Sequence, residues 1–416
     1  MQPADTNAES LLLALYHAGL EAVAGESVTA RYLRRRPWQP EKPVALLACG
    51  KAAPAMARGA ATALGQRVER ALLVTKHGHR ESGLPAHWQC LEAGHPLPDE
   101  ASLHAGQQLL EFIAVLPAGM PLLALISGGS SALLEVLPPG VSLADLRRVN
   151  DWLLGSGAGI ADMNRVRKML SCIKGGRLAG YLGERPVLNL MISDVAGDDP
   201  AVIGSGLLTP GPANELPLID LPEWLSALLG KRADCPPAAV STPLIEQQII
   251  ACNRDACEAV ADAARARSLA VEVHDPLYGP IPGVTAQLAG FLRTAAPGVH
   301  VWGGEPTLVL PRSPGRGGRN QHLALSLARA LAGERGISIL CGATDGSDGP
   351  GHDAGALIDG TTVLQEVDYP GGAGRALTRA DSGTFLAEAG ALIDTGPTGT
   401  NVMDLVIAIK TGPRDE

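Results

Sequence analysis

Short loops that combine glycine with a cation, a hydroxyl or a carboxylate recur along this sequence, and such loops can bind anions. In the first, Gly50-Lys51 follows the apolar run Pro43 to Cys49 and precedes the helix-like segment Ala52 to Leu64. The amides at a helix start attract anions, and a lysine adds a point charge for a phosphate or carboxylate. Position 45 is alanine, so this loop is not a Walker A motif. The alternative is a surface lysine at a turn.

A serine–glycine loop follows another apolar run, Leu122 to Ile126. Its sequence is Ser127-Gly128-Gly129-Ser130-Ser131. Two glycines let the backbone approach a ligand closely, and hydroxyls together with amides can surround phosphate oxygens. The loop is therefore a candidate binding element, with these candidate residues: Ser127, Gly128, Gly129 and Ser130. A tight strand–helix turn is the alternative.

A basic segment spans residues 164 to 177. Asn164, Arg167 and Lys168 would share one face of a helix, and Lys174 follows in the turn Lys174-Gly175-Gly176-Arg177. A cationic face suits a polyanion such as a nucleoside triphosphate, so Arg167, Lys168 and Lys174 are candidate binding residues. A salt-bridged helix surface is the alternative.

An acidic loop, Ser193 to Asp199, follows the apolar run Val187 to Ile192. Its carboxylates are Asp194, Asp198 and Asp199. Carboxylates at the end of a strand can hold Mg²⁺ or accept a proton from a substrate hydroxyl. An Asx turn with helix caps is the alternative.

The second half repeats this pattern in four loops. Gly303-Gly304-Glu305 ends an apolar run, the Gly/Arg loop 315–321 opens a helix-like segment, and the loops 344–350 and 395–401 are rich in Gly, Asp and Thr. The Gly/Arg loop lacks the third glycine of G-x-G-x-x-G, so it is not a dinucleotide fingerprint. Turns remain the alternative for the last two loops. The candidate residues are Glu305, Gly317, Gly318, Arg319, Asn320, Asp345, Thr398 and Asn401.

Strand-like and helix-like segments alternate along the whole chain, which predicts an α/β fold. Apolar runs flanked by helices indicate strands buried on both faces of a parallel sheet, where ligands bind at the carboxyl ends. A proline-rich stretch near 210–243 suggests the main break. We therefore expect a doubly wound, Rossmann-like domain at 1–238, a smaller α/β domain at 239–416, and an active site in the cleft between them.

Composition excludes several protein classes. The chain has 416 residues, a formal net charge of -9 and 46% hydrophobic residues, which favours a folded protein that does not bind nucleic acid. No run of about 18 apolar residues occurs, so no membrane span is expected. The apolar segment Leu11 to Leu15 has no basic region before it, which argues against a signal peptide. Seven cysteines without a C-x-x-C pair predict reduced, buried thiols and a cytoplasmic location.

The ordered series of motifs resembles the class II glycerate kinases, whose C-terminal domain is named for the MOFRL motif. The resemblance covers about residues 8 to 410. The matching stretches are Gly50 to Ala53, Ser127 to Leu133, Asn164 to Lys168, Ser171 to Ala179, Ser193 to Pro200, Gly303 to Glu305, Gly317 to Gln321, Thr344 to Pro350 and Thr395 to Val402. The sequence departs from the family pattern at Leu207-Leu208, which puts fine substrate preference in doubt, and at Gly383.

The resemblance implies an ATP- and Mg²⁺-dependent kinase that phosphorylates the 2-hydroxyl of D-glycerate. It makes Lys51 and Arg319 catalytic or substrate-anchoring cations and Asp194 the candidate base, with Asp198, Asp199 and Asp345 as candidate Mg²⁺ ligands. The small-molecule substrate glycerate is the only partner expected, and a homo-oligomer stays open. An NAD(P)H-dependent hydroxypyruvate reductase and a nucleotide-binding regulator without catalysis are the alternatives; the missing dinucleotide fingerprint argues against the reductase.

Overall fold

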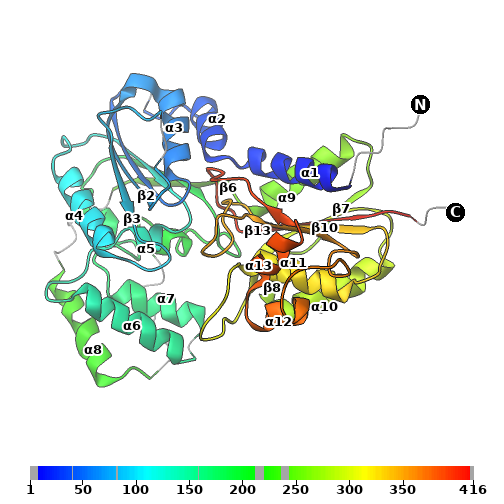
Figure 1. Cartoon of the computed structure of the whole chain (residues 1–416). Helices are drawn as coiled ribbons and strands as arrows, with labels where there is room; N and C mark the ends of the chain where they lie inside the picture. Colours follow the sequence, from blue (N-terminus) through cyan, green and yellow to red (C-terminus); the bar gives the residue numbers. More distant parts are fainter. Residues whose placement is uncertain are drawn as a thin grey trace. The chain divides into compact units, whose positions relative to one another are not determined.

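A computed structural model describes residues 8–39, 41–80, 83–157, 159–210, 220–235 and 243–412. The chain forms two compact units. One is the continuous segment Gly25–Ile250, and the other combines Met1–Ala24 with Ala251–Glu416. Figure 1 shows both units with their helices and strands labelled. The expected two-domain α/β fold is confirmed.

The unit Gly25–Ile250 is built on one six-stranded sheet with the order β3-β2-β1-β4-β5-β6. Strands β1 to β5 pair in parallel, and every residue of β1, β4 and β5 is buried. This order is that of Rossmann folds, in which the chain reverses direction across the sheet between β1 and β4. The strands are β1 (Val44–Cys49), β2 (Val68–Lys76), β3 (Gln89–Ala93), β4 (Leu122–Ile126), β5 (Val187–Ile192) and β6 (Ile245–Ala251).

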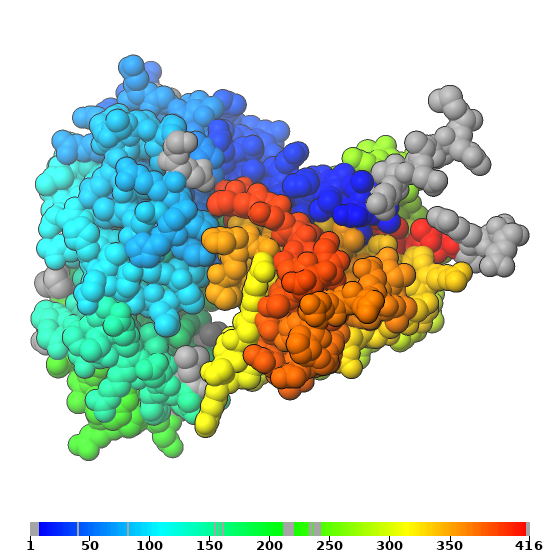
Figure 2. Space-filling model, in the orientation of Figure 1, coloured from blue at the N-terminus to red at the C-terminus, as the bar shows by residue number. Residues whose placement is uncertain are grey.

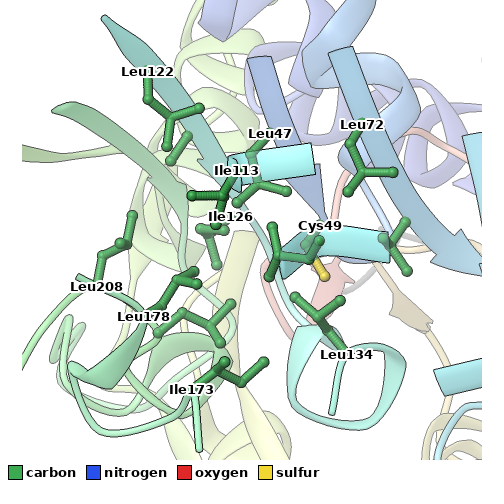
Figure 3. Close-up of a cluster of buried hydrophobic side chains, with 14 of the residues drawn as sticks. Leu47, Cys49, Leu72, Ile113, Leu122, Ile126, Leu134, Ile173, Leu178 and Leu208 are labelled. Atoms are coloured by element: carbon green, nitrogen blue, oxygen red, sulfur yellow. The ribbon is translucent and has the colours of Figure 1, made fainter. Parts of the chain in front are cut away.

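Helices between these strands cover the sheet. Helix α4 begins with a capping box in which Asp99 and Ser102 satisfy each other's backbone amides. Its apolar residues join one buried cluster with β1, β2 and β4, and Figure 3 shows Leu47, Leu72 and Leu122 of the strands in that cluster with Ile113 of α4. The helices are α2 (Gly25–Arg35), α3 (Ala53–Leu64), α4 (Glu100–Ala114), α5 (Ser130–Leu133), α6 (Leu143–Gly155), α7 (Ile160–Met169) and α8 (Glu223–Gly230), with 3-10 turns η1 (Gly65–Arg67), η2 (Arg177–Tyr181), η3 (Ile203–Ser205) and η4 (Lys231–Asp234).

The second unit contains a seven-stranded sheet of mixed direction. Its order is β12-β11-β10-β13-β9-β7, and β8 pairs with β9. The central strands β9, β13 and β10 are antiparallel, whereas β7 and β8 run parallel to β9. The strands are β7 (Val271–Val273), β8 (Leu277–Pro280), β9 (Gly298–Thr307), β10 (Ile337–Ala343), β11 (Gly355–Asp359), β12 (Leu392–Ile393) and β13 (Asp404–Lys410). The helices are α9 (Asn253–Arg265), α10 (Ile281–Thr294), α11 (Arg319–Ala330), α12 (Gly372–Thr378) and α13 (Ser382–Glu388).

The N-terminal helix α1 (Ala8–Ala22) packs on this second unit. The buried Tyr16 hydroxyl donates to the Ala343 carbonyl oxygen at the end of β10, at 2.6 Å. In Figure 2, α1 is the dark blue segment that lies beside orange C-terminal residues. The units therefore change over near residues 24 and 250, whereas the proline-rich composition suggested one boundary at 238. The difference arises because α1 packs on β10 and because β6 extends the first sheet beside β5.

One pair of cysteines departs from the sequence expectation of reduced thiols. Cys172 and Cys235 form a disulfide with a Cα–Cα distance of 5.6 Å, so that expectation was wrong for this pair. The two residues lie 63 positions apart, and the fold brings them together. Cys49, Cys257 and Cys341 are buried free thiols, as expected.

None of the described helices combines the length and the apolar character that a bilayer crossing requires.

Candidate active site

The loops after β1 and β4 meet where the first sheet reverses its strand order, which is where such sheets bind ligands. The Lys51 amide donates to the Gly128 carbonyl oxygen, and the Ser127 amide donates to the Cys49 carbonyl oxygen, each at 2.9 Å. Gly50 has φ 127°, and a Cβ there would lie 2.1 Å from Ser127 Oγ. Only glycine therefore lets the two loops approach this closely, and the approach puts half-buried Lys51 beside the serine–glycine loop.

The serine hydroxyls of this loop hold its own backbone in place. Ser127 Oγ accepts from the Ala52 amide at 3.1 Å, and Ser130 Oγ donates to the carbonyl oxygens of Cys49 and Ser127 at 2.8 and 2.5 Å. Both serines are fully buried. The two side chains thus fix the loop's shape, which leaves its glycine backbone as the part suited to approach a ligand.

Gly129 lies between two basic side chains. A Cβ at this position would be 3.1 Å from His95 Cδ2 and 3.3 Å from Lys51 Cγ. His95 follows β3 and was not singled out from the sequence. Its proximity to the Lys51 side chain makes it a neighbour of the candidate site.

The acidic loop follows β5, the strand next to β4. Asp194 is half-buried at the start of the loop, Asp198 is half-buried with φ 53°, and Asp199 is exposed. Asp199 Oδ1 accepts from the Ala201 amide at 2.9 Å, which is the Asx-turn geometry considered as the alternative. Because the carboxyl ends of parallel strands share one edge of the sheet, this loop lies on the same edge as Lys51.

Two contacts attach the segment after β5 to its surroundings. Lys168 Nζ donates to the Ala201 carbonyl oxygen at 2.7 Å, and the hydroxyls of Ser131 and Ser205 lie 2.6 Å apart. The first contact brings helix α7 and the second brings the serine–glycine loop against the same segment. The structure therefore brings Lys168, the serine–glycine loop and the acidic loop together.

Arg167 and Lys174 do not form an open cationic face. Arg167 Nε donates to Asn150 Oδ1 at 2.9 Å, and burial lowers the pKa of Arg167. Lys174 is 2% exposed and pairs with buried Glu135, with Nζ and Oε2 at 2.5 Å. Since Glu135 neutralises it inside the unit, Lys174 serves the interior of the fold in this arrangement.

In the second unit, Arg319 opens α11 beside two acidic side chains. Its guanidinium lies 2.7 Å from Glu305 Oε1 and 3.4 Å from Asp404 Oδ2. Burial opposes the charge of the guanidinium, but Asp404 and Glu305 raise the pKa of Arg319. Strand pairing explains the arrangement: Asp404 at the start of β13 is opposite Gly304 on β9 and Ala343 on β10.

Asp404 is a buried carboxylate, 3% exposed. Burial raises the pKa of Asp404 to about 7, although Arg319 favours the charged form. Among the described residues, its Oδ2 has no hydrogen-bond partner. A buried carboxylate oxygen of this kind can hold a proton or accept a cation.

Asp348 caps the helix that carries Arg319. Its two carboxylate oxygens accept from the amides of Asn320 and Gln321 at 3.0 and 2.8 Å. A Cβ on Gly318 would lie 2.3 Å from Asp348 Oδ1, so glycine makes room for this cap. Gly317 has φ 124° and lies against the Gly383 amide. Gly317, Gly318 and Asn320 therefore position the start of α11 and with it Arg319.

The remaining two loops meet at Thr344. Thr398 Oγ1 donates to the Thr344 carbonyl oxygen at 2.5 Å, and the next residue, Asp345, is 8% exposed and accepts from the Ser347 amide. Asn401 is 7% exposed in the loop that leads to β13. Thr398, Asn401 and Asp345 thus lie at the same end of the sheet as Asp404.

Three residues that shape these sites were missed from the sequence: Asp404, Asp348 and Glu135. Asp404 and Glu135 each stand alone as a charge within an apolar run, Val402 to Ile409 and Leu133 to Leu137. A lone charge in a buried apolar segment needs a partner, and this pattern could have identified both. Asp348 lies within the loop 344–350, but Asp-Gly-containing loops are usually turns, so the sequence alone predicted no role for it.

Two protein-family models match the chain. Residues 11–220 match the domain of unknown function DUF4147, and residues 298–404 match the MOFRL family. The first match includes the loops at Lys51, Ser127 and Asp194. The second includes Glu305, Arg319 and Asp345.

Individual relatives cover nearly the whole chain. A D-glycerate 2-kinase from Thermotoga maritima is 34% identical over 88% of this chain and 90% of its own length. A protein from Agrobacterium vitis with the provisional name hydroxypyruvate reductase is 37% identical over 96% of this chain and 94% of its own length. The crystal structure of a glycerate kinase from Thermotoga maritima superimposes with a TM-score of 0.83 at 32% identity, covering 97% of this chain and 99% of that one.

Proposed function

The chain belongs to the glycerate kinase family that carries a C-terminal MOFRL domain, and on this premise we propose that it phosphorylates D-glycerate at the 2-hydroxyl. The donor in this proposal is ATP, and the products are 2-phosphoglycerate and ADP. The observation that carries the proposal is the match to a D-glycerate 2-kinase over 88% of this chain and 90% of that protein. It is supported by the serine–glycine loop, which is suited to bind an anion and lies where the first sheet reverses its strand order.

Charge placement at the first sheet supports phosphoryl transfer. Catalysis of this reaction depends mainly on positioning the phosphates and neutralising their charge. Lys51 at the start of α3 and the glycine backbone of the serine–glycine loop supply a cation and a close backbone approach at one sheet edge. Lys168 is attached to the segment that follows the acidic loop.

Asp194 is the residue we propose to accept the proton of the substrate hydroxyl. It is half-buried and directly follows β5, where the carboxylate can reach a ligand at the strand ends. Arg319, held by the capped start of α11, is the second cation in the proposal. The cleft between the domains, where Lys51 and Arg319 would act on one substrate, stays a prediction.

The candidate magnesium ligands have the chemistry that this ion prefers, namely carboxylate oxygens. Asp198 and Asp199 belong to the first unit, and Asp345 belongs to the second. In the second unit, Asp404 Oδ2 lies 3.4 Å from the Arg319 guanidinium and has no hydrogen-bond partner among the described residues, which supports a role for these carboxylates in accepting a cation. When bound, Mg²⁺ would neutralise developing charge on the transferred phosphoryl group.

The reductase alternative has little support in the fold. In Rossmann folds the first strand–helix turn carries a glycine-rich fingerprint, and an acidic residue further along binds the ribose. Here that turn reads Gly50-Lys51-Ala52-Ala53 with a single glycine, and β2 ends in Lys76. A dinucleotide site would need different residues at both places.

The test is to measure ADP release from Mg²⁺-ATP and D-glycerate, and to pass the product to enolase without phosphoglycerate mutase. Direct consumption by enolase identifies 2-phosphoglycerate and supports the proposal. A requirement for mutase would indicate 3-phosphorylation. ATP binding without ADP formation would favour the regulator, and NADH oxidation with hydroxypyruvate would favour the reductase. Cytoplasmic location and oligomeric state stay predictions.

A further inference from the structure

Glu272, His274 and His300 form a cluster on one face of the second sheet. Strand β7 pairs with β9 so that Glu272 is opposite His300, and the His274 amide donates to the Val301 carbonyl oxygen at 2.9 Å. Residues two apart along a strand share a face, so Glu272 and His274 project on the same side. The pairing register therefore places a carboxylate and two imidazoles side by side.

The polar atoms of the three side chains converge. His274 Nε2 lies 3.1 Å from His300 Nδ1, and Glu272 Oε2 lies 3.9 and 3.8 Å from these two nitrogens. Ligand atoms around tetrahedral zinc, with bonds of about 2.0–2.2 Å, are about 3.3–3.6 Å apart. Shifts of a few tenths of an ångström would bring all three atoms into that range.

A backbone hydrogen bond fixes which nitrogen of His300 faces the cluster. His300 Nε2 lies 3.0 Å from the Ala296 carbonyl oxygen, which can only accept, so Nε2 carries the proton. The lone pair of Nδ1 then points toward His274 and Glu272. Imidazoles that bind metals usually donate their other N–H in this way, which orients the ring.

Aromatic packing holds the second imidazole. The His274 ring stacks on Trp302 at a centroid distance of 4.4 Å and meets Phe291 edge to face at 4.8 Å. His300 is buried, whereas the Glu272 side chain is 64% exposed. One side of the cluster is therefore rigid and the other is open to solvent, which gives an ion a route of entry.

A hydrogen bond between the two histidines does not by itself explain why the Glu272 carboxylate lies beside them. If His274 Nε2 donates to His300 Nδ1, Glu272 Oε2 remains beyond hydrogen-bond distance of both rings. Neutral imidazoles are the form that binds metals.

We propose that Glu272, His274 and His300 bind a divalent transition metal ion, with Zn²⁺ the best match to two imidazoles, one carboxylate and a water. The ion would join edge strand β7 to β9. The site is separate from the kinase reaction proposed above, because His300 and Glu305 are five residues apart on β9, about 16 Å at the rise of an extended strand.

Zinc binding is measured on the full chain after removal of metals with EDTA. Zn²⁺ is titrated by calorimetry and by competition with a chromogenic chelator, with millimolar Mg²⁺ present to occupy carboxylate sites. We expect one tight equivalent. Removing a ligand in His274→Ala or His300→Ala should weaken binding by about 100-fold or more, since even losing a supporting contact costs about 10–100-fold. The exposed histidine variant His104→Ala is the control and should bind like the parent.

Two further measurements keep the result independent of folding. Glu272→Gln changes an exposed side chain, so it should keep the fold and still bind at least tenfold more weakly. Bound Co²⁺ should give visible absorption bands of a four-coordinate site in the parent and lose them in Glu272→Gln. If the parent binds no zinc at micromolar concentration, or all variants bind equally, the cluster is only a hydrogen-bonded network and the proposal is wrong.

Discussion

Lys51 and Arg319 are the two cations of the proposed reaction, and both have defined surroundings. Lys51 lies in a loop fixed by three hydrogen bonds, and Arg319 lies between Glu305 and Asp404. If both stabilise charge during phosphoryl transfer, Lys51→Ala and Arg319→Ala should each lower kcat by on the order of 10²-fold or more. Steady-state kinetics with Mg²⁺-ATP and D-glycerate measures this.

Matched controls separate a loss of catalysis from a loss of folding. Lys42→Ala removes an exposed lysine before β1. Arg316→Ala removes a half-exposed arginine from the Gly/Arg loop that also contains Arg319, and this arginine pairs with Asp353. Both controls should retain turnover within a few-fold, and all four variants should keep the parent's circular dichroism. Near-normal turnover in Lys51→Ala or Arg319→Ala would remove that residue from the active site.

The buried carboxyl of Asp404 makes stability depend on pH in a definite direction. Its pKa is about 7 in the fold and about 4 in an unfolded chain. Between these values the folded state holds a proton that the unfolded state has released, so the free energy of unfolding falls as pH rises from about 4 to 7 and is level above. Asp404→Asn removes this dependence, and its stability relative to the parent should rise across that window.

Denaturant unfolding at a series of pH values in EDTA tests this expectation. The exposed Asp275→Asn is the matched control, and its stability curve should run parallel to that of the parent. Equal slopes for Asp404→Asn and the parent between pH 4 and 7 would show that Asp404 is ionised throughout.

Single residues were predicted with uneven success, and the reason is physical. Residue type and position after a strand identified the loops at Lys51, Ser127 and Arg319, because glycines and polar groups cluster where strands end. The same residue types also serve the interior: Ser127 and Ser130 hold backbone, and Lys174 pairs with Glu135, 39 positions away in sequence. Local sequence contains no information about such distant partners.

The strand-end loops depend on close backbone packing, which glycine permits. At Gly50 an alanine Cβ would lie 2.1 Å from Ser127 Oγ, in a backbone conformation that side chains rarely adopt. We therefore expect Gly50→Ala to lower the free energy of unfolding by more than about 1 kcal/mol and to displace the Lys51 loop. Chemical denaturation and turnover measure the two effects.

Gly155→Ala is the comparison variant for this loop. Gly155 ends α6, and apart from its chain neighbours and the backbone of its own helix turn, a Cβ there would meet no described atom within 4 Å. Its stability should stay within about 0.5 kcal/mol of the parent. If Gly50→Ala is as stable and as active as Gly155→Ala, the loops after β1 and β4 are less tightly packed than the distances indicate.

The regular elements were easier to anticipate than their partners. Apolar runs, interrupted only by Asn189 in β5, predicted β1, β4 and β5, since strands buried on both faces of a parallel sheet are mostly apolar. Strand β6 has a mixed pattern of half-buried and exposed residues, so composition did not show that it extends the first sheet. Which sheet an edge strand joins depends on contacts made after the chain has folded back.

The division of the chain into two units was hard to predict for the same reason, because it depends on contacts between distant segments. The first 24 residues belong with the C-terminal unit, although more than 200 residues separate them in sequence. An amphipathic sequence pattern predicts that another apolar surface will cover one face of the helix, but it does not predict which part of the protein supplies that surface. Here the buried Tyr16 ring lies against Gly342, where a Cβ would be 2.9 Å away, so the absence of a side chain at 342 makes room for the helix.

This attachment predicts that a change in the N-terminal helix destabilises the distant C-terminal unit. Tyr16→Phe removes one of two donors to the Ala343 carbonyl oxygen, which keeps the Gly346 amide at 3.1 Å, and losing this one hydrogen bond should cost about 0.5–1.5 kcal/mol. Amide hydrogen exchange should therefore speed up in β10 and β13 and remain unchanged in β1 and β4. Tyr32→Phe, at a half-buried tyrosine in α2, is the control and should leave β10 and β13 unaffected. Equal acceleration in both units would mean that they unfold as one, and no acceleration in either would mean that α1 contributes little to holding β10.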